Sequence, residues 1–274
     1  MALLHPSALD TVVAIGVLDE HKRKKWIGTG FLFGMYTGVT EGEIEYHKIC
    51  LVTNKHVALN HHQFCIKFNP TTDQSSKDFI IDKGSAGKTN YHGHNDPNVD
   101  VGVFYINIEL VRKQGMKLDY IKENHTAFRL EQMRQMEISE GHGVYVLGFP
   151  MALLDTDRQY VIVREGCIAR IRDLYEGRKK DFLCDALVFP GNSGGPLFIK
   201  PEVTAVAGTK SNYKSGLIGI VKSYIPYQDV AISVQTKRPR ITFEENSGLS
   251  SVEPVDHIIE TIQQLIEIGK AEKK

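Results

Sequence analysis

Short runs rich in β-branched and aromatic residues follow one another along most of this chain, with turn residues between them. The runs cover residues 11–18, 28–34, 45–53, 63–68, 101–108, 144–148, 160–164, 167–171, 182–188, 196–199 and 217–224. Many short strands at such spacing predict an all-β barrel or sandwich. Because long helical patterns do not alternate with these runs, we do not expect a doubly wound parallel sheet.

A polar stretch over residues 109–143 interrupts the series and includes the helix-compatible segment 127–136. We interpret the stretch as a linker between two halves of the molecule. The expected organisation is therefore an N-terminal β-unit over residues 1–108 and a C-terminal β-unit over residues 144–253.

The last segment, residues 254–274, is expected to form a helix. Pro254 stands at its start, lysines stand at its end, and its apolar residues recur at helical spacing. These apolar residues are Val255, Ile258, Ile259, Ile262, Leu265 and Ile266. Because the pattern covers only about three turns, we expect its apolar face to pack on the core rather than to enter a membrane or a coiled coil.

The charge balance argues against a polyanionic partner. The chain has 33 basic and 33 acidic residues, so its formal net charge is zero, and nucleic-acid binding is not expected. No apolar run is long enough to cross a bilayer, so no membrane association is expected either. The first ten residues lack the basic region of a secretion signal. We therefore expect a cytoplasmic protein.

Cysteine usage agrees with that compartment. Cys50, Cys65, Cys167 and Cys184 each lie among strand-like residues, and none belongs to a CxxC pair. We interpret them as reduced, buried hydrophobic residues rather than as a disulfide framework or a zinc site. Two of them could pair if the protein were exported.

The segment 190–196, with the sequence PGNSGGP, offers a serine in a glycine-rich turn. A serine hydroxyl is a weak nucleophile unless it has a base and donors aimed at the oxygen that becomes negative. Gly191 can adopt backbone angles closed to other residues and so turn its N–H and that of Ser193 toward one point. Gly194 and Gly195 keep side-chain bulk away. We predict Ser193 as nucleophile and the N–H groups of Gly191 and Ser193 as its oxyanion hole; an ordinary glycine turn is the alternative.

His56 is the predicted base. It follows a strand-like run that ends in Thr-Asn-Lys, and the small Ala58 stands just after it. Two other histidine pairs invite a metal interpretation, and they are His61 with His62 and His92 with His94. Neither pair has a carboxylate or a cysteine at a consistent ligand spacing, so we interpret all four as solvated loop residues and predict no metal site.

Asp100 heads an apolar run, where a carboxylate is unfavourable unless its charge has a partner. A hydrogen bond accepted from a histidine N–H would offset that cost and fix the histidine tautomer. Asp96 is the competing acid, but it precedes Pro97 in a polar loop and is better interpreted as a turn residue.

In these residues the chain resembles the trypsin-like (chymotrypsin-fold) serine peptidases, most closely bacterial stand-alone and HtrA-like members. The resemblance extends from about Val12 to the C-terminal helix and is carried by the motifs GTGF, LVTNKHV, DVGV, VLGFP and GNSGGP. The order His, Asp, Ser also fits, with separations of 44 and 93 residues.

The resemblance implies two antiparallel six-stranded β-barrels with the active site between them. It also implies a serine endopeptidase, a hydrolase in which Ser193 attacks, His56 acts as base and then as acid, and Asp100 orients His56. No cofactor is implied.

Three departures from the family bear on regulation. Asn192 stands where digestive members carry an acid that pairs with a new N-terminus, so we expect no zymogen cleavage of that kind. The disulfide beside the catalytic histidine is missing, and no PDZ-like segment follows the C-terminal β-unit. Control is expected from loop ordering or from a regulatory protein partner.

The resemblance also indicates where a substrate would lie. Leu187, six residues before Ser193, stands where the family has the base of its primary pocket. A leucine offers no counter-charge, so we expect uncharged, apolar residues before the scissile bond. Further substrate contacts are expected from Val221, Lys222, Ser223, Tyr224 and Gly248. An edge strand pairs with an added strand, so the substrate is expected to be extended or locally unfolded.

The polar segment 225–245 carries Lys237, Arg238 and Arg240 close together. A solvated hairpin is the simpler interpretation, and a loop that docks a protein substrate is the alternative. For the whole chain, a protease-fold binding module without catalysis remains the alternative to a peptidase. An esterase is less consistent with the strand-rich context and with a histidine that precedes the serine.

Overall fold

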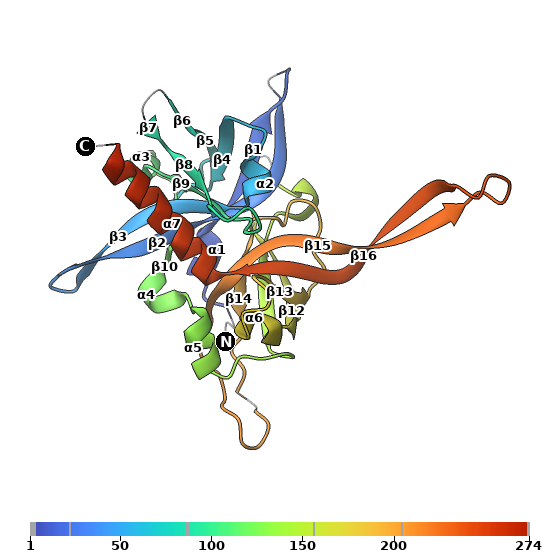
Figure 1. Ribbon diagram of the computed structural model, residues 1–274. Helices are drawn as coiled ribbons and strands as arrows, with labels where there is room; N and C mark the ends of the chain where they lie inside the picture. Colours follow the sequence, from blue (N-terminus) through green and yellow to red (C-terminus); the bar gives the residue numbers. More distant parts are fainter. Residues whose placement is uncertain (1–3, 22, 86–87, 156, 204, 273–274) are drawn as a thin grey trace.

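The strands fall into two mostly antiparallel groups, one before and one after a mostly helical segment of the chain (Figure 1). The computed structural model describes residues 4–21, 23–85, 88–155, 157–203 and 205–272. Within these residues, no helix is both long enough and apolar enough to span a bilayer.

The N-terminal group is a curled sheet in the order β5-β4-β1-β2-β3-β9-β8, and β10 pairs with β2. Its strands are β1 (Val12–Leu18), β2 (Lys24–Glu41), β3 (Ile44–Thr53), β4 (Gln63–Phe68), β5 (Lys77–Asp82), β8 (Tyr91–Gly93), β9 (Gly102–Tyr105) and β10 (Ile121–Lys122). A small separate pair is formed by β6 (Gly84–Ser85) and β7 (Lys88–Thr89). The central strands are buried over their apolar halves, which forms one side of the core.

The C-terminal group is a closed six-stranded barrel in the order β11-β12-β13-β16-β15-β14. Its strands are β11 (Gly143–Gly148), β12 (Ile162–Arg170), β13 (Phe182–Asp185), β14 (Pro196–Ile199), β15 (Gly216–Ile232) and β16 (Pro239–Pro254). Every residue of β11 and β14 is buried, as expected for short apolar runs in the wall of a packed barrel.

The predicted all-β fold of chymotrypsin type with a C-terminal helix is confirmed, and its N-terminal half differs in one detail. The seven-strand path ends at β5 and β8, and the described residues contain no pairing between these two strands. Because β8 is only three residues long and its recorded pairing is with β9, the sheet curls without closing as the C-terminal barrel does.

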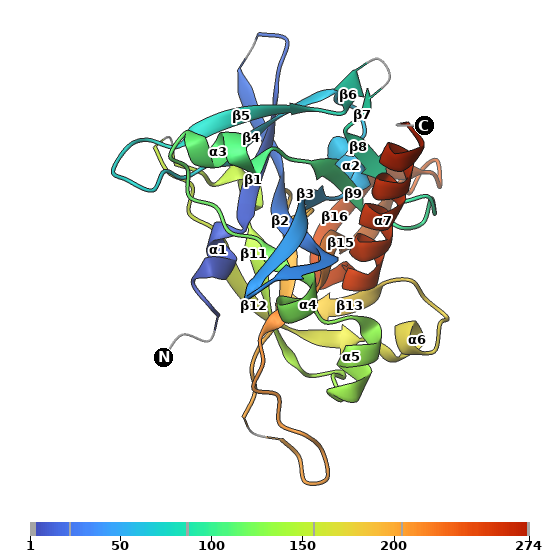
Figure 2. The same cartoon turned by 90° about the vertical axis from the view of Figure 1, so that its left-hand side faces the viewer.

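Short helices lie before, within and between the β-groups. They are α1 (Ser7–Asp10), α2 (Lys55–Ala58), α3 (Ile108–Lys113), α4 (Glu123–Thr126), α5 (Leu130–Gln135), the 3-10 turn η1 (Pro150–Ala152) and α6 (Arg172–Tyr175). The long helix α7 (Val255–Ala271) follows β16 directly. It runs along β8 and β9 of the other half (Figure 2), so the last element of the chain is attached to both β-groups.

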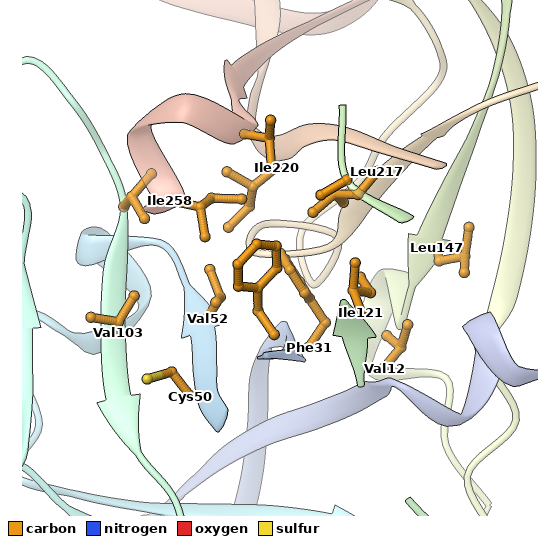
Figure 3. Close-up of a cluster of buried hydrophobic side chains, with 14 of the residues drawn as sticks. Val12, Phe31, Cys50, Val52, Val103, Ile121, Leu147, Leu217, Ile220 and Ile258 are labelled. Atoms are coloured by element: carbon orange, nitrogen blue, oxygen red, sulfur yellow. The ribbon is translucent and has the colours of Figure 1, made fainter. Parts of the chain in front are cut away.

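One hydrophobic cluster joins the two halves (Figure 3). Phe31 and Val52 of the N-terminal sheet contribute to the same cluster as Leu147 and Ile220 of the barrel. Ile258 of α7 is also a member and is fully buried. The cluster fixes the two β-groups relative to each other, which a site assembled from both halves requires.

The outer parts of β15 and β16 form a long hairpin that projects from the body (Figure 1). Residues 226–232 pair with residues 239–246, and the arm is largely exposed. The simpler interpretation of segment 225–245, a solvated hairpin, therefore describes its structure.

Candidate active site

His56 and Asp100 form a hydrogen-bonded pair. His56 lies in α2, which begins after β3 ends at Thr53, and its Nδ1 is 2.6 Å from Asp100 Oδ2. The backbone N–H of His56 donates to Asp100 Oδ1 at 3.0 Å. Because an ionised carboxylate only accepts hydrogen bonds, the proton of this pair lies on Nδ1 and leaves Nε2 free to accept one.

The backbone of Asp100 makes two hydrogen bonds of its own. Asn54, which is fully buried, donates its Nδ2 to the Asp100 carbonyl at 2.8 Å. The Asp100 N–H donates to Glu253 Oε1 at 3.0 Å. Burial, with the charge of Asp100 as a second cause, raises the pKa of Tyr91 to about 12, so the phenol beside this carboxylate stays neutral at physiological pH.

Ser193 lies in a turn whose glycines have no room for a side chain. Gly191 has φ +101°, and a Cβ there would lie 2.3 Å from the Phe149 carbonyl oxygen. Gly194 has φ +85°, and a Cβ there would lie 2.1 Å from the Thr29 carbonyl oxygen. Both positions therefore require glycine because of their backbone angles and because another chain segment approaches closely.

Thr29 of β2 joins this turn to its neighbours. Its hydroxyl donates to the Gly191 carbonyl at 2.6 Å and accepts from the Phe149 N–H at 3.1 Å. Its backbone N–H donates to the Ser193 carbonyl at 2.9 Å. Thr53 in turn donates its hydroxyl to the Thr29 carbonyl at 2.8 Å. The strands of the N-terminal sheet thus support a turn that belongs to the barrel.

The peptide before Gly191 has a fixed orientation. The Met151 N–H donates to the Pro190 carbonyl at 2.6 Å. Because a trans peptide directs its C=O and N–H to opposite sides, the Gly191 N–H faces away from Met151. In the described part of the chain, the N–H groups of Gly191 and Ser193 donate to no protein acceptor, which leaves both available for a developing negative charge.

Met151 and the next residue, Ala152, both have φ +55°. Such angles are strained for residues with a Cβ, and they cluster at functional sites when the surrounding structure holds them.

The histidine and the serine come together from the two halves. A Cβ added at Gly28 would lie 2.9 Å from Val57, which follows His56, and 3.3 Å from the Ser193 carbonyl oxygen. The His56 side chain is 48% exposed and that of Asp100 is 16% exposed. Within the described residues, no hydrogen bond joins Ser193 Oγ to His56. The His56 ring therefore has an open side that faces solvent.

The residues expected to bind substrate have several different environments. Val221 is buried. Its N–H donates to the Gly195 carbonyl, and its carbonyl accepts from the Gly194 N–H, both in the serine turn. Lys222 extends its ammonium to Glu253 at 3.0 Å rather than to solvent. Ser223 is exposed.

Tyr224 donates its hydroxyl to Glu244 at 2.7 Å. Leu187 is 41% exposed. Gly248 has φ +84° and donates its N–H to Asn246 at 2.9 Å. Of the expected set, all but Val221 keep some accessible surface.

Within the described residues, the side chains of the other candidates make no hydrogen bond to His56 or Asp100. The Asp96 carboxylate accepts from the Asn98 N–H and pairs with Lys180. His92 and His94 differ from the expected solvated loop residues, because they hydrogen-bond to Gln264 and Glu260 of α7. In the described part of the chain, no group of three or more His, Cys, Asp or Glu side chains is arranged to hold a metal ion.

Several supporting residues had no role in the sequence analysis. Thr29 lies inside the GTGF motif, and Asn54 lies inside LVTNKHV. The family motifs therefore pointed to both positions, although their residue types alone gave no reason for a supporting role. Glu253 had no such signal, because its contact with Asp100 joins residues 153 positions apart.

The family described as "Trypsin-like peptidase domain" matches residues 28–206, more than half of the chain. Among solved structures, the chain is similar to one described as "Crystal structure of Rv3671c protease, inactive form". The two share 16% sequence identity over 94% of this chain and 90% of that chain, with a TM-score of 0.47. No curated protein matches the chain.

Proposed function

The chain belongs to the trypsin-like peptidase domain family, and from this premise we propose that it is a serine endopeptidase with the triad His56, Asp100 and Ser193. The observation that carries the proposal is the 2.6 Å hydrogen bond between His56 Nδ1 and Asp100 Oδ2. It leaves the second ring nitrogen of His56 as a base on the side open to solvent.

The proposed reaction proceeds in two halves. Ser193 Oγ attacks the peptide carbonyl carbon while His56 Nε2 takes the hydroxyl proton, and the carbonyl oxygen becomes negative. The N–H groups of Gly191 and Ser193 stabilise that oxygen. His56 then donates its proton to the leaving amine, which gives an acyl-enzyme. Water, activated by the same base, releases the acid product and restores Ser193.

The proposed substrate is an extended or locally unfolded segment of a protein. Ser223 and Tyr224 lie on β15 beyond its pairing with β14, which ends at Ile220. A peptide added there would take the place of the missing neighbour strand. The leucine at position 187 supports a preference for apolar residues before the scissile bond, because a buried cation would have no counter-charge there.

Fluorogenic reporter peptides test this preference. With purified protein, peptides that carry Leu, Val or Ala before the reporter should be hydrolysed faster than matched peptides with Lys or Arg. Faster cleavage after Lys or Arg would contradict the proposed pocket, and Ser193→Ala should abolish hydrolysis of both sets.

A partner-gated state is the second candidate function. It is favoured by one observation, namely that Ser193 Oγ makes no hydrogen bond to His56 within the described residues. In this version a regulatory protein partner, or the substrate itself, draws the two groups together, and the isolated chain acts as a binding module until then.

For localisation, we propose the cytoplasm. All four cysteines are free thiols, and three of them are buried. This supports a reducing compartment.

A further inference from the structure

A buried carboxylate lies directly behind the His56–Asp100 pair. Glu253, near the end of β16, has a fully buried side chain. Its Oε1 accepts the Asp100 N–H at 3.0 Å. This contact reaches the backbone of the residue that orients His56, yet Glu253 has no part in the proposed reaction.

Two cationic or polar partners hold Glu253 in place. Lys222 of β15 is 3.0 Å away through its Nζ, and His257 Nδ1 of α7 is 2.7 Å from Glu253 Oε2. Burial opposes the charge on Lys222, but the carboxylate of Glu253 outweighs it, so the pKa of Lys222 is raised. A buried carboxylate without such partners would be strongly unfavourable.

The charged groups around Glu253 come from several elements. Lys222 also lies 3.8 Å from Asp181, which precedes β13. The ring of His94 lies 5.6 Å from the ring of His257, and His94 bonds to Glu260. Through Glu253, these contacts link β15, the residue before β13 and the first turn of α7 to the backbone N–H of Asp100.

We propose that Glu253 is a positioning residue, anchored by Lys222 and His257, which holds the Asp100 backbone where its carboxylate meets His56. The proposal rests on the proposed endopeptidase function. Asp100 follows a loop in which Asp96 is half-buried and Asn98 is exposed. Two hydrogen bonds fix its backbone: the Asn54 amide donates to its carbonyl, and its N–H donates to Glu253. Loss of the second would leave a backbone N–H without a partner and free the peptide to rotate.

Two matched double variants isolate that single hydrogen bond. Lys222→Met/Glu253→Gln removes both charges and keeps an oxygen that can accept the Asp100 N–H. Lys222→Met/Glu253→Leu removes both charges and the acceptor. Replacing a buried ion pair by apolar groups is often neutral for stability, and urea unfolding would establish that both variants fold.

The first readout is the rate at which a fluorophosphonate labels Ser193. We expect the Leu variant to be labelled at least about tenfold more slowly than the Gln variant, because a small misplacement of a catalytic group has a large effect on rate. Glu267→Gln, on the exposed side of α7, is the matched control and should not change the rate. Equal labelling rates for the two double variants would overturn the proposal.

The second readout does not depend on catalysis. In a Ser193→Ala background, the proton shared by His56 Nδ1 and Asp100 should give a low-field NMR signal, because the hydrogen bond is short. We expect this signal to persist in the Gln variant and to weaken or move upfield in the Leu variant. The same signal in both would overturn the proposal.

The proposed endopeptidase function and the positioning role of Glu253 can fail separately. If wild type is not labelled at all, the proposed function of the isolated chain fails, and the NMR comparison still tests the positioning role. If the Leu variant does not fold, His257→Leu against His257→Gln provides a second pair, since only Gln can donate to Glu253. The signal should weaken in His257→Leu alone, and no difference between these two variants would overturn the proposal.

Discussion

Thr29 joins the serine turn to the loop before η1 through one hydroxyl group. That hydroxyl donates to the Gly191 carbonyl and accepts from the Phe149 N–H, and the residue is fully buried. This arrangement fixes the Gly191–Asn192 peptide, which lies between the two N–H groups assigned to the oxyanion hole. Its role is to orient the turn, since it lies behind the turn rather than in contact with a substrate.

Thr29→Val tests this role at the scale of one residue. The valine has nearly the same shape but leaves the Gly191 carbonyl and the Phe149 N–H without their partner. We expect unfolding free energy to fall by about 1–3 kcal/mol and fluorophosphonate labelling of Ser193 to slow by about tenfold or more. Thr29→Ser keeps the hydroxyl and should retain most of the labelling rate. Wild-type labelling in Thr29→Val would contradict the assignment.

Individual residues differed in how far the sequence could predict them. Ser193, His56 and Asp100 were identified from the residue types within short motifs, and the hydrogen bond between His56 and Asp100 agrees with that prediction. Lys222 was predicted to contact the substrate, and the structure adds an ion pair between its ammonium and Glu253. The sequence could not indicate this, because the two residues are brought together only by the pairing of β15 with β16.

Among the elements, the apolar runs predicted where strands occur more accurately than they predicted where each strand begins and ends. The runs 63–68 and 196–199 coincide with β4 and β14. The runs 160–164 and 167–171 are instead parts of one strand, β12. Strand β5 was missed because its residues are only partly buried, and a half-exposed strand has a weaker apolar pattern. The outer part of β15 has no such apolar pattern, and the solvated hairpin that was the simpler interpretation of segment 225–245 agrees with its exposed residues.

The helix α7 was predicted from its periodicity, and its buried residues have the expected spacing. Ile262 is fully buried in the cluster that joins the two halves. Ile262→Ala should therefore lower the free energy of unfolding by about 2–5 kcal/mol, as core truncations do. Urea unfolding is the measurement, and Glu267→Ala on the exposed side of the same helix should change stability by no more than about 0.5 kcal/mol. Equal effects of the two substitutions would contradict the packing described for α7.

At the scale of the whole molecule, contacts between the β-groups decide the shape of the site. The sequence predicted two β-units but could not give their relative placement, because the shared cluster combines residues from both ends of the chain, such as Val12 and Leu265. It also could not show that the N-terminal sheet stays open. The path ends at β5 and β8, and within the described residues these two strands do not pair.

Asp96 and Lys180 form an ion pair between a loop of the N-terminal half and the barrel. The hydrogen bond from Lys180 is the main cause that lowers the pKa of Asp96 to about 2. A carboxyl whose folded-state pKa is depressed stabilises the fold above its unfolded value, about 3.9, and loses that contribution as the pH falls toward its folded value.

Asp96→Asn should therefore lower the thermal unfolding midpoint slightly near pH 7, and the difference from wild type should shrink between about pH 4 and pH 2. Thermal unfolding followed at several pH values is the measurement. Asp155→Asn, at an exposed position, serves as control and should show no such trend. A difference that stays constant down to about pH 2 would contradict the assigned ion pair.

The central claim is that the chain holds an activated serine at position 193, and a fluorophosphonate probe tests it most directly. Purified wild type and Ser193→Ala would each be treated with the probe, and labelling would be located by mass spectrometry of the peptide that contains Ser193. We predict that wild type is labelled at Ser193 and that Ser193→Ala is not labelled. Absence of labelling in both proteins would contradict a preassembled triad in the isolated chain and would favour the partner-gated state.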